Sequence, residues 1–197
     1  IFKYHELRAK FPKSNACFRI LLTLVKDDAF RALLEEYMQK NIRAGVPSLG
    51  SDLDALYQIT DQHNDGKWIR ALDPIDVRAN TVALTVLEIV QAFIASLETG
   101  ATFPRTDAKE DPSALLWSYY LEAHVLERMG RYTEALATID KAIAHTPTGV
   151  DLYQKKGRIL KKCGDIAAAA SIINGGRKLD LADRYINNKS TKYLLRA

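Results

Sequence analysis

The sequence predicts an all-α fold in which antiparallel helix pairs stack one after another as a solenoid. Two observations lead to this expectation. Apolar residues recur at helical spacing along most of the chain, whereas the alternation of apolar and polar residues that is typical of β-strands is nearly absent. From residue 113 onward the chain also repeats itself with a period of 34 residues, which is the length of one helix pair in a helical repeat protein.

The part before the repeat, residues 1–112, is expected to form irregular helical hairpins. Its clearest helix covers 27–41, where Asp27 and Asp28 are available as N-terminal caps. Large apolar side chains follow on one face of this helix: Phe30, Leu33, Leu34, Tyr37 and Met38. The segment 14–25 begins at a Ser-Asn pair after a proline and predicts the preceding helix of a hairpin.

Three loops are expected in this part, near 43–51, 61–74 and 98–112, because glycine, proline and small polar residues gather there. A short helix is expected at 52–60. The most apolar window, 82–97, is interrupted by polar residues and is shorter than the roughly 20 apolar residues that cross a bilayer. We therefore expect a buried helix there and no membrane anchor.

The C-terminal part, residues 113–197, carries the repeat. Seven pairs of positions match at a separation of 34 residues: Tyr119/Tyr153, Ala123/Gly157, Leu126/Leu160, Gly130/Gly164, Ala135/Ala169, Ile139/Ile173 and Ala142/Gly176. Small residues at the helix contact and a glycine in the turn are typical of tetratricopeptide repeats. The sequence thus predicts a tetratricopeptide-type α-solenoid. Two repeats, 113–149 and 150–183, would be followed by the first helix of a third, 184–197.

The charge of the chain is unevenly distributed. Residues 151–197 carry eleven Lys or Arg against four Asp, a net charge of +7, whereas residues 1–150 carry a net charge of −3. This asymmetry indicates either an anionic partner for the C-terminal part, such as phosphate, RNA or an acidic surface, or a basic helix face that only meets water. The tyrosines there suggest no stacking platform, so sequence-specific nucleic-acid binding is not expected.

The sequence contains no recognisable catalytic motif. The glycine-rich phosphate loops, the HExxH metal motif and the GxSxG nucleophile motif are all missing. Cys17 and Cys163 have no metal-binding spacing and fit free thiols in a reducing compartment. We expect no catalytic and no metal-binding residues. Tyr120 and His124 stand where tetratricopeptide proteins that clamp acidic peptides carry Lys and Asn, which disfavours that activity.

Several stretches together resemble one family, the auxiliary, ribosome-anchoring subunit of the N-terminal acetyltransferase A complex. The resemblance rests on "FRALLEEYMQKNIRAGVPSL", on the helical repeats, and on the elements "ADRYIN" and "KYLLRA". It covers most of 27–60 and nearly all of 110–197, and is loose over 61–100. The chain opens without Met, so it looks like an internal fragment of a longer protein.

This resemblance implies a noncatalytic scaffold that binds a catalytic acetyltransferase subunit and orients it at the ribosome, in the cytoplasm. It implies no membrane partner. The alternative is a generic tetratricopeptide adaptor that binds some other protein or an acidic peptide.

The resemblance also implies a ligand. In that family an inositol hexakisphosphate lies between scaffold and catalytic subunit, held by a motif with the spacing K-x-x-K-Y. Lys189, Lys192 and Tyr193 have this spacing, and positions i, i+3 and i+4 share one side of a helix. We expect them to form part of a polyphosphate site.

Overall fold

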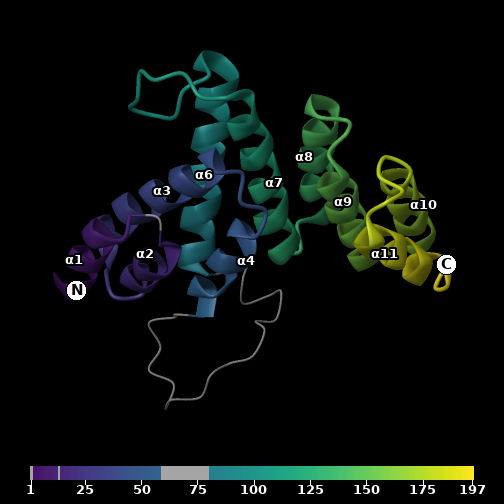
Figure 1. The fold of residues 1–197 in the computed structure, drawn as a ribbon, viewed down its shortest axis with the longest axis horizontal. Helices are drawn as coiled ribbons and strands as arrows, with labels where there is room; N and C mark the ends of the chain where they lie inside the picture. The colour runs from purple at the N-terminus through teal and green to yellow at the C-terminus, as the bar shows by residue number, and fades with distance from the viewer. Residues whose placement is uncertain (1, 13, 59–79) are drawn as a thin grey trace, which may run out of the picture. The chain divides into compact units, whose positions relative to one another are not determined.

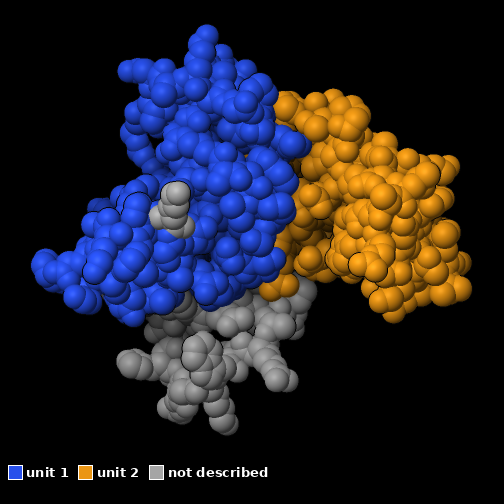
Figure 2. Space-filling model, in the orientation of Figure 1, with its two compact units in different colours: residues 1–117 blue, residues 118–197 orange. Residues whose placement is uncertain are grey.

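A computed structural model describes residues 2–12, 14–58 and 80–197 of the chain (Figure 1). Within these residues the regular structure is helical, and the one β-type pairing is an isolated bridge between Thr102 and Lys109. The predicted all-α class is confirmed. The chain forms two compact units, residues 1–117 and 118–197 (Figure 2), and each is described by itself.

Unit 1 contains one helix that the sequence pattern did not predict. Its elements are α1 (Phe2–Lys10), α2 (Asn15–Leu22), α3 (Asp27–Arg43), α4 (Leu49–Asp54), the 3₁₀ turn η1 (Leu56–Gln58), α6 (Thr81–Gly100) and the start of α7 (Pro112–Arg128). Helix α1 buries none of its residues, so it has no apolar stripe that could have predicted it. The predicted loop at 61–74 lies outside the described residues.

Two local details of unit 1 differ from the expectation. The loop expected near 43–51 is present but shorter, because helix α4 begins at Leu49, and this helix ends at Asp54, earlier than the expected helix 52–60. Asp27 and Asp28 lie in the first turn of α3 rather than at its N-cap, which is Lys26, and no side chain caps this end. Asp27 instead adopts a left-handed backbone conformation with φ 53°.

The core of unit 1 is built around aromatic pairs. Phe18 of α2 meets Tyr37 of α3 edge to face, with ring centroids 5.2 Å apart. Phe93 of α6 meets Phe103 in the same way at 4.8 Å, and Phe103 is fully buried. The loop between α6 and α7 is therefore anchored to the core by its aromatic side chain.

Helix α6 is long and apolar enough to cross a membrane by length and composition. In the structure its apolar side chains line the interior of unit 1: Ala83, Val86, Leu87, Ile89, Val90, Phe93, Ile94 and Leu97 are buried. Polar residues occupy exposed positions between them, as at Glu88 and Gln91. This is the pattern of a core helix, which agrees with the expectation for 82–97.

Unit 2 consists of helices packed in series. After the second half of α7 come α8 (Tyr132–His145), α9 (Val150–Lys162), α10 (Ile166–Arg177) and α11 (Arg184–Leu194). Helix α10 packs against both α9 and α11, and α8 packs against α9. Gly130 and Gly164 lie in the turns after α7 and α9 with φ values of 70° and 92°. These left-handed conformations explain the glycine at equivalent positions of the two repeats.

Helices α9 and α10 approach each other closely at Gly157. A Cβ atom at this position would lie 2.4 Å from Cγ1 of Ile173 and 2.7 Å from its Cδ1, well inside van der Waals contact. Both residues are buried, so Ile173 has little room to move. The small residue expected from the repeat pattern is thus required by helix packing.

We predict that Gly157→Ala destabilises the protein by about 1–2 kcal/mol, because overpacking of the α9–α10 contact outweighs the better helix propensity of alanine. Gly175→Ala is the matched control: Gly175 lies inside α10, and nothing lies within 4 Å of a Cβ atom there. This control should be stabilised by up to about 1 kcal/mol. Urea unfolding measures both, and equal stabilities of the two variants would contradict the prediction.

Candidate functional site

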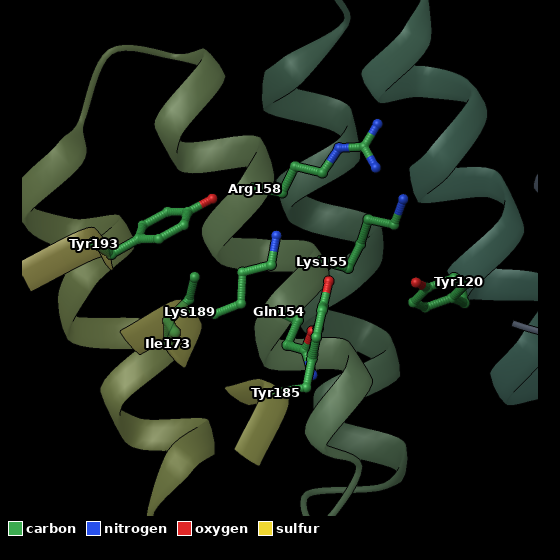
Figure 3. A pocket seen from close by; sticks show the side chains of 8 residues that line it. All are labelled: Tyr120, Gln154, Lys155, Arg158, Ile173, Tyr185, Lys189 and Tyr193. Carbon is green, nitrogen blue, oxygen red and sulfur yellow. The ribbon is translucent and has the colours of Figure 1, made fainter. Parts of the chain in front are cut away.

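Unit 2 contains a cavity of about 170 Å³, shown in Figure 3. Its walls come from four helices: Tyr120 from α7, Gln154, Lys155 and Arg158 from α9, Ile173 from α10, and Tyr185, Lys189 and Tyr193 from α11. Cavities that enclose a small organic ligand usually measure about 300–1,000 Å³. This one therefore suits a single charged group, or one edge of a larger ligand.

Helix α11 contributes a stripe of residues four positions apart, namely Tyr185, Lys189 and Tyr193. Asp183 is the N-cap of this helix, and its carboxylate accepts a hydrogen bond from the backbone N–H of Tyr185 at 2.7 Å. Ile186 and Ser190 are buried on the side of the helix next to this stripe. The burial of these two residues sets the rotation of α11, and this rotation turns the stripe into the cavity.

The structure separates the three residues that the sequence brought together. Lys189 and Tyr193 line the cavity, but Lys192 is exposed and does not. Positions 189 and 193 lie roughly 40° apart around a helix, while 192 lies about 60° to the other side of 189. The assignment of all three as polyphosphate ligands stays a prediction. Lys192 lies farther from the cavity than the other two.

Sequence reasoning missed the residues that α9 contributes. Lys155 is almost fully buried and Arg158 is exposed, and both reach the cavity wall. Arg158 follows Lys155 by three positions, and Lys162 follows Arg158 by four. The three cations therefore form one row along α9. This spacing was visible in the sequence, but only the fold shows that the row meets α11 at the same cavity.

A buried carboxylate faces this row. The side chain of Glu127, on α7, is fully buried, and its oxygens lie 3.2 Å from Nζ of Lys155, 2.7 Å from Nε of Arg158 and 2.9 Å from Nζ of Lys162. Nζ of Lys155 also donates to Nδ1 of His124 at 2.9 Å, since an ammonium group can only donate. We call Glu127 and its three cation partners, Lys155, Arg158 and Lys162, the Glu127 cluster.

The electrostatics of the cavity favour an anion. Burial by itself would raise the pKa of Glu127, but Lys155, Arg158 and Lys162 outweigh it and lower this pKa to about 2. Burial raises the pKa of Tyr120 to about 12 and also raises the pKa of Tyr193. Both hydroxyls are therefore protonated at neutral pH and can donate hydrogen bonds. The wall combines cations and O–H donors without a carboxylate of its own.

Aromatic rings accompany the lysines around the cavity. Nζ of Lys155 lies 5.1 Å from the centre of the Tyr120 ring, and Nζ of Lys189 lies 5.2 Å from that of Tyr185. Lys161 is placed in the same way 5.6 Å from the Tyr193 ring. Such cation–π contacts restrain flexible lysine side chains, so part of the cationic wall is held in place before any ligand arrives.

Other parts of the described chain offer weaker candidates. Unit 1 has a larger groove of about 360 Å³ with an apolar floor that includes Leu22, Phe30 and Leu56. Its charged rim is mixed, with two cations and two aspartates, and so favours no particular ligand. Among the described residues, no group of His, Cys, Asp or Glu could hold a metal ion, and Cys17 and Cys163 are free thiols.

The Glu127 cluster predicts a specific pH dependence of stability. The ordinary pKa of this carboxyl is 4.5, and the folded value is about 2, so its contribution is complete above pH about 5 and is lost as the pH falls through about 2. The expected loss of unfolding free energy is about 3 kcal/mol. Urea unfolding of wild type and Glu127→Gln between pH 6 and pH 2 should show two curves that converge. Parallel curves would contradict this prediction.

Comparison with known proteins gives the family. Residues 2–197 match the family model of the N-terminal acetyltransferase A auxiliary subunit. The chain is 38% identical to the auxiliary subunit NAA15 of this complex from Arabidopsis thaliana, over 98% of the chain and 19% of that protein. It is 34% identical to the human NatA auxiliary subunit called N-alpha-acetyltransferase 16, over 98% of the chain and 20% of that protein.

The fold agrees with this match. A solved structure of Naa15 and Naa10 bound to HypK-THB contains a chain similar to this one, with a TM-score of 0.72 and 29% identity, over 98% of this chain and 25% of that one. The chain spans about a fifth of the length of the curated relatives. Its sequence and its fold together show that this chain belongs to the family of auxiliary subunits of the N-terminal acetyltransferase A complex.

Proposed function

We propose that the protein to which this chain belongs is a noncatalytic scaffold that binds and orients the catalytic subunit of a ribosome-associated N-terminal acetyltransferase. The observation that carries the proposal is the family match along nearly the whole chain. The structure of the similar Naa15 also holds Naa10, which supports a catalytic subunit as partner. Helical solenoids bind partners over extended surfaces, and the stacked helices of unit 2 have this architecture. The proposal places the protein in the cytoplasm.

Co-purification tests this scaffold role. The full-length protein, expressed in its own cells with an affinity tag, should retain an acetyltransferase subunit, and the eluate should acetylate peptide N-termini with acetyl-CoA as donor. Ribosomes should be retained as well, and more weakly at higher salt, because their RNA is contacted through phosphates. If no acetyltransferase co-purifies, the generic adaptor takes the place of the scaffold.

The cavity of unit 2 is proposed as part of an inositol hexakisphosphate site. Lys155, Arg158 and Lys189 offer positive charge, and the protonated hydroxyls of Tyr120 and Tyr193 offer neutral donors. Charge-assisted hydrogen bonds of this kind are the strong ones in phosphate recognition. A cavity of about 170 Å³ would take one edge of the ligand and leave other phosphates for groups outside it.

Lys189 and Lys192 are expected to differ as ligands. Lys189→Ala should weaken binding of inositol hexakisphosphate about tenfold or more, because a charge-assisted hydrogen bond in the cavity is worth about 1.5–3 kcal/mol. Lys192→Ala should weaken it only a few-fold, because Lys192 is exposed outside the cavity. Titration calorimetry on the full-length protein with its catalytic subunit measures both.

Lys178→Ala serves as the matched control, because Lys178 is an exposed cation at the C-terminal end of α10 and does not line the cavity. It should bind as wild type does. An equal loss in Lys189→Ala and Lys178→Ala would mean that only the overall charge matters, and the proposed site would then be wrong.

A further inference from the structure

We infer that Glu127 is a positioning residue of the anion site: its carboxylate holds Lys155 and Arg158 of α9 in the arrangement in which they face the cavity. The inference rests on the proposed function, since it assumes that the cavity binds a polyphosphate. Glu127 itself does not line the cavity. It would act on the ligand only through Lys155 and Arg158, the two of its three cation partners that line the cavity.

The contacts of Glu127 show how this positioning works. Its two oxygens divide the row on α9 between them, with one facing Arg158 and Lys162 and the other facing Lys155. The contact with Arg158 uses Nε, so the two terminal nitrogens of the guanidinium stay available for another acceptor. Lys155 is held from two sides, by Glu127 and by Nδ1 of His124.

Without the carboxylate of Glu127, the three cations of α9 would not keep their arrangement. Lys155, Arg158 and Lys162 place three like charges on one face of one helix, and like charges at this spacing repel one another. The side chain of Lys155 is only 3% exposed, so its charge has little access to water. A buried ammonium without a counter-ion either loses its proton or turns outward, and both would remove it from the cavity wall.

If Glu127 acted only through its charge, its removal would change the affinity for the anion in the opposite direction. A carboxylate next to an anion site repels the anion, so its removal should strengthen binding if the cations stay where they are. Positioning predicts weaker binding, because the gain in net charge does not compensate for displaced donors. The direction of the change therefore distinguishes the two roles.

The experiment is a titration of inositol hexakisphosphate into the full-length protein with its catalytic subunit. Glu127→Gln keeps the size of the side chain and removes its charge. We expect binding about tenfold weaker or more, the usual range for the loss of a group that orients direct ligands. Glu134→Gln on α8 is the matched control, because it makes the same charge change at an exposed carboxylate that pairs with Arg131. The control should bind as wild type does.

A double variant covers the case in which Glu127→Gln loses its helical circular dichroism. Glu127→Gln with Lys162→Gln restores the wild-type net charge and relieves repulsion in the row, and Lys162 does not line the cavity. Its affinity should be about tenfold lower than that of Lys162→Gln alone.

Each outcome has one meaning. Equal or tighter binding by Glu127→Gln, or by the double variant relative to Lys162→Gln, would overturn the inference and leave the polyphosphate site in place. A wild-type protein that does not bind inositol hexakisphosphate at all would instead overturn the proposed site itself.

Discussion

The geometry of unit 2 depends on the close approach of α9 to α10 at Gly157, where no side chain fits between the helices. This contact determines which way α9 faces. Residues 155, 158 and 162 lie roughly 100–160° around the helix from Gly157, so packing at the glycine directs them away from α10. The cationic row thus reaches Glu127 on α7 because of an apolar contact on another side of α9. Ile173, which fills the space at Gly157, also forms part of the cavity wall.

The cavity combines two kinds of constraint on its charged groups. Glu127 holds Lys155 of α9 by an ion pair in the interior, where charges interact strongly because little water screens them. The tyrosines hold lysines through their ring faces and keep their own protons, since burial raises the pKa of Tyr120 to about 12. Buried ion pairs add little stability over apolar packing and are better explained by the specific arrangement that they enforce. A fixed set of donors is what an anion site requires.

The position of the cavity follows from the solenoid. Helices α7, α9 and α11 are the first helices of successive pairs, and they supply all of its polar wall residues. In a solenoid each repeat contacts only its neighbours, so three consecutive first helices can line one cavity together. A short part of a long auxiliary subunit can therefore form this cavity.

Local patterns in the sequence were enough to predict most of the helices, their arrangement in pairs and the family. Apolar periodicity and a 34-residue repeat require only local spacing, and the glycines at 130 and 164 report a backbone conformation that few other residues adopt. Only the tertiary fold shows which cations line one cavity. It separates Lys192 from Lys189, adds Lys155 and Arg158, and pairs these two with Glu127, because the rotation of each helix is set by the contacts it buries against its neighbours. Helix α1 was not predicted from the sequence, because it buries no residue and therefore has no apolar stripe.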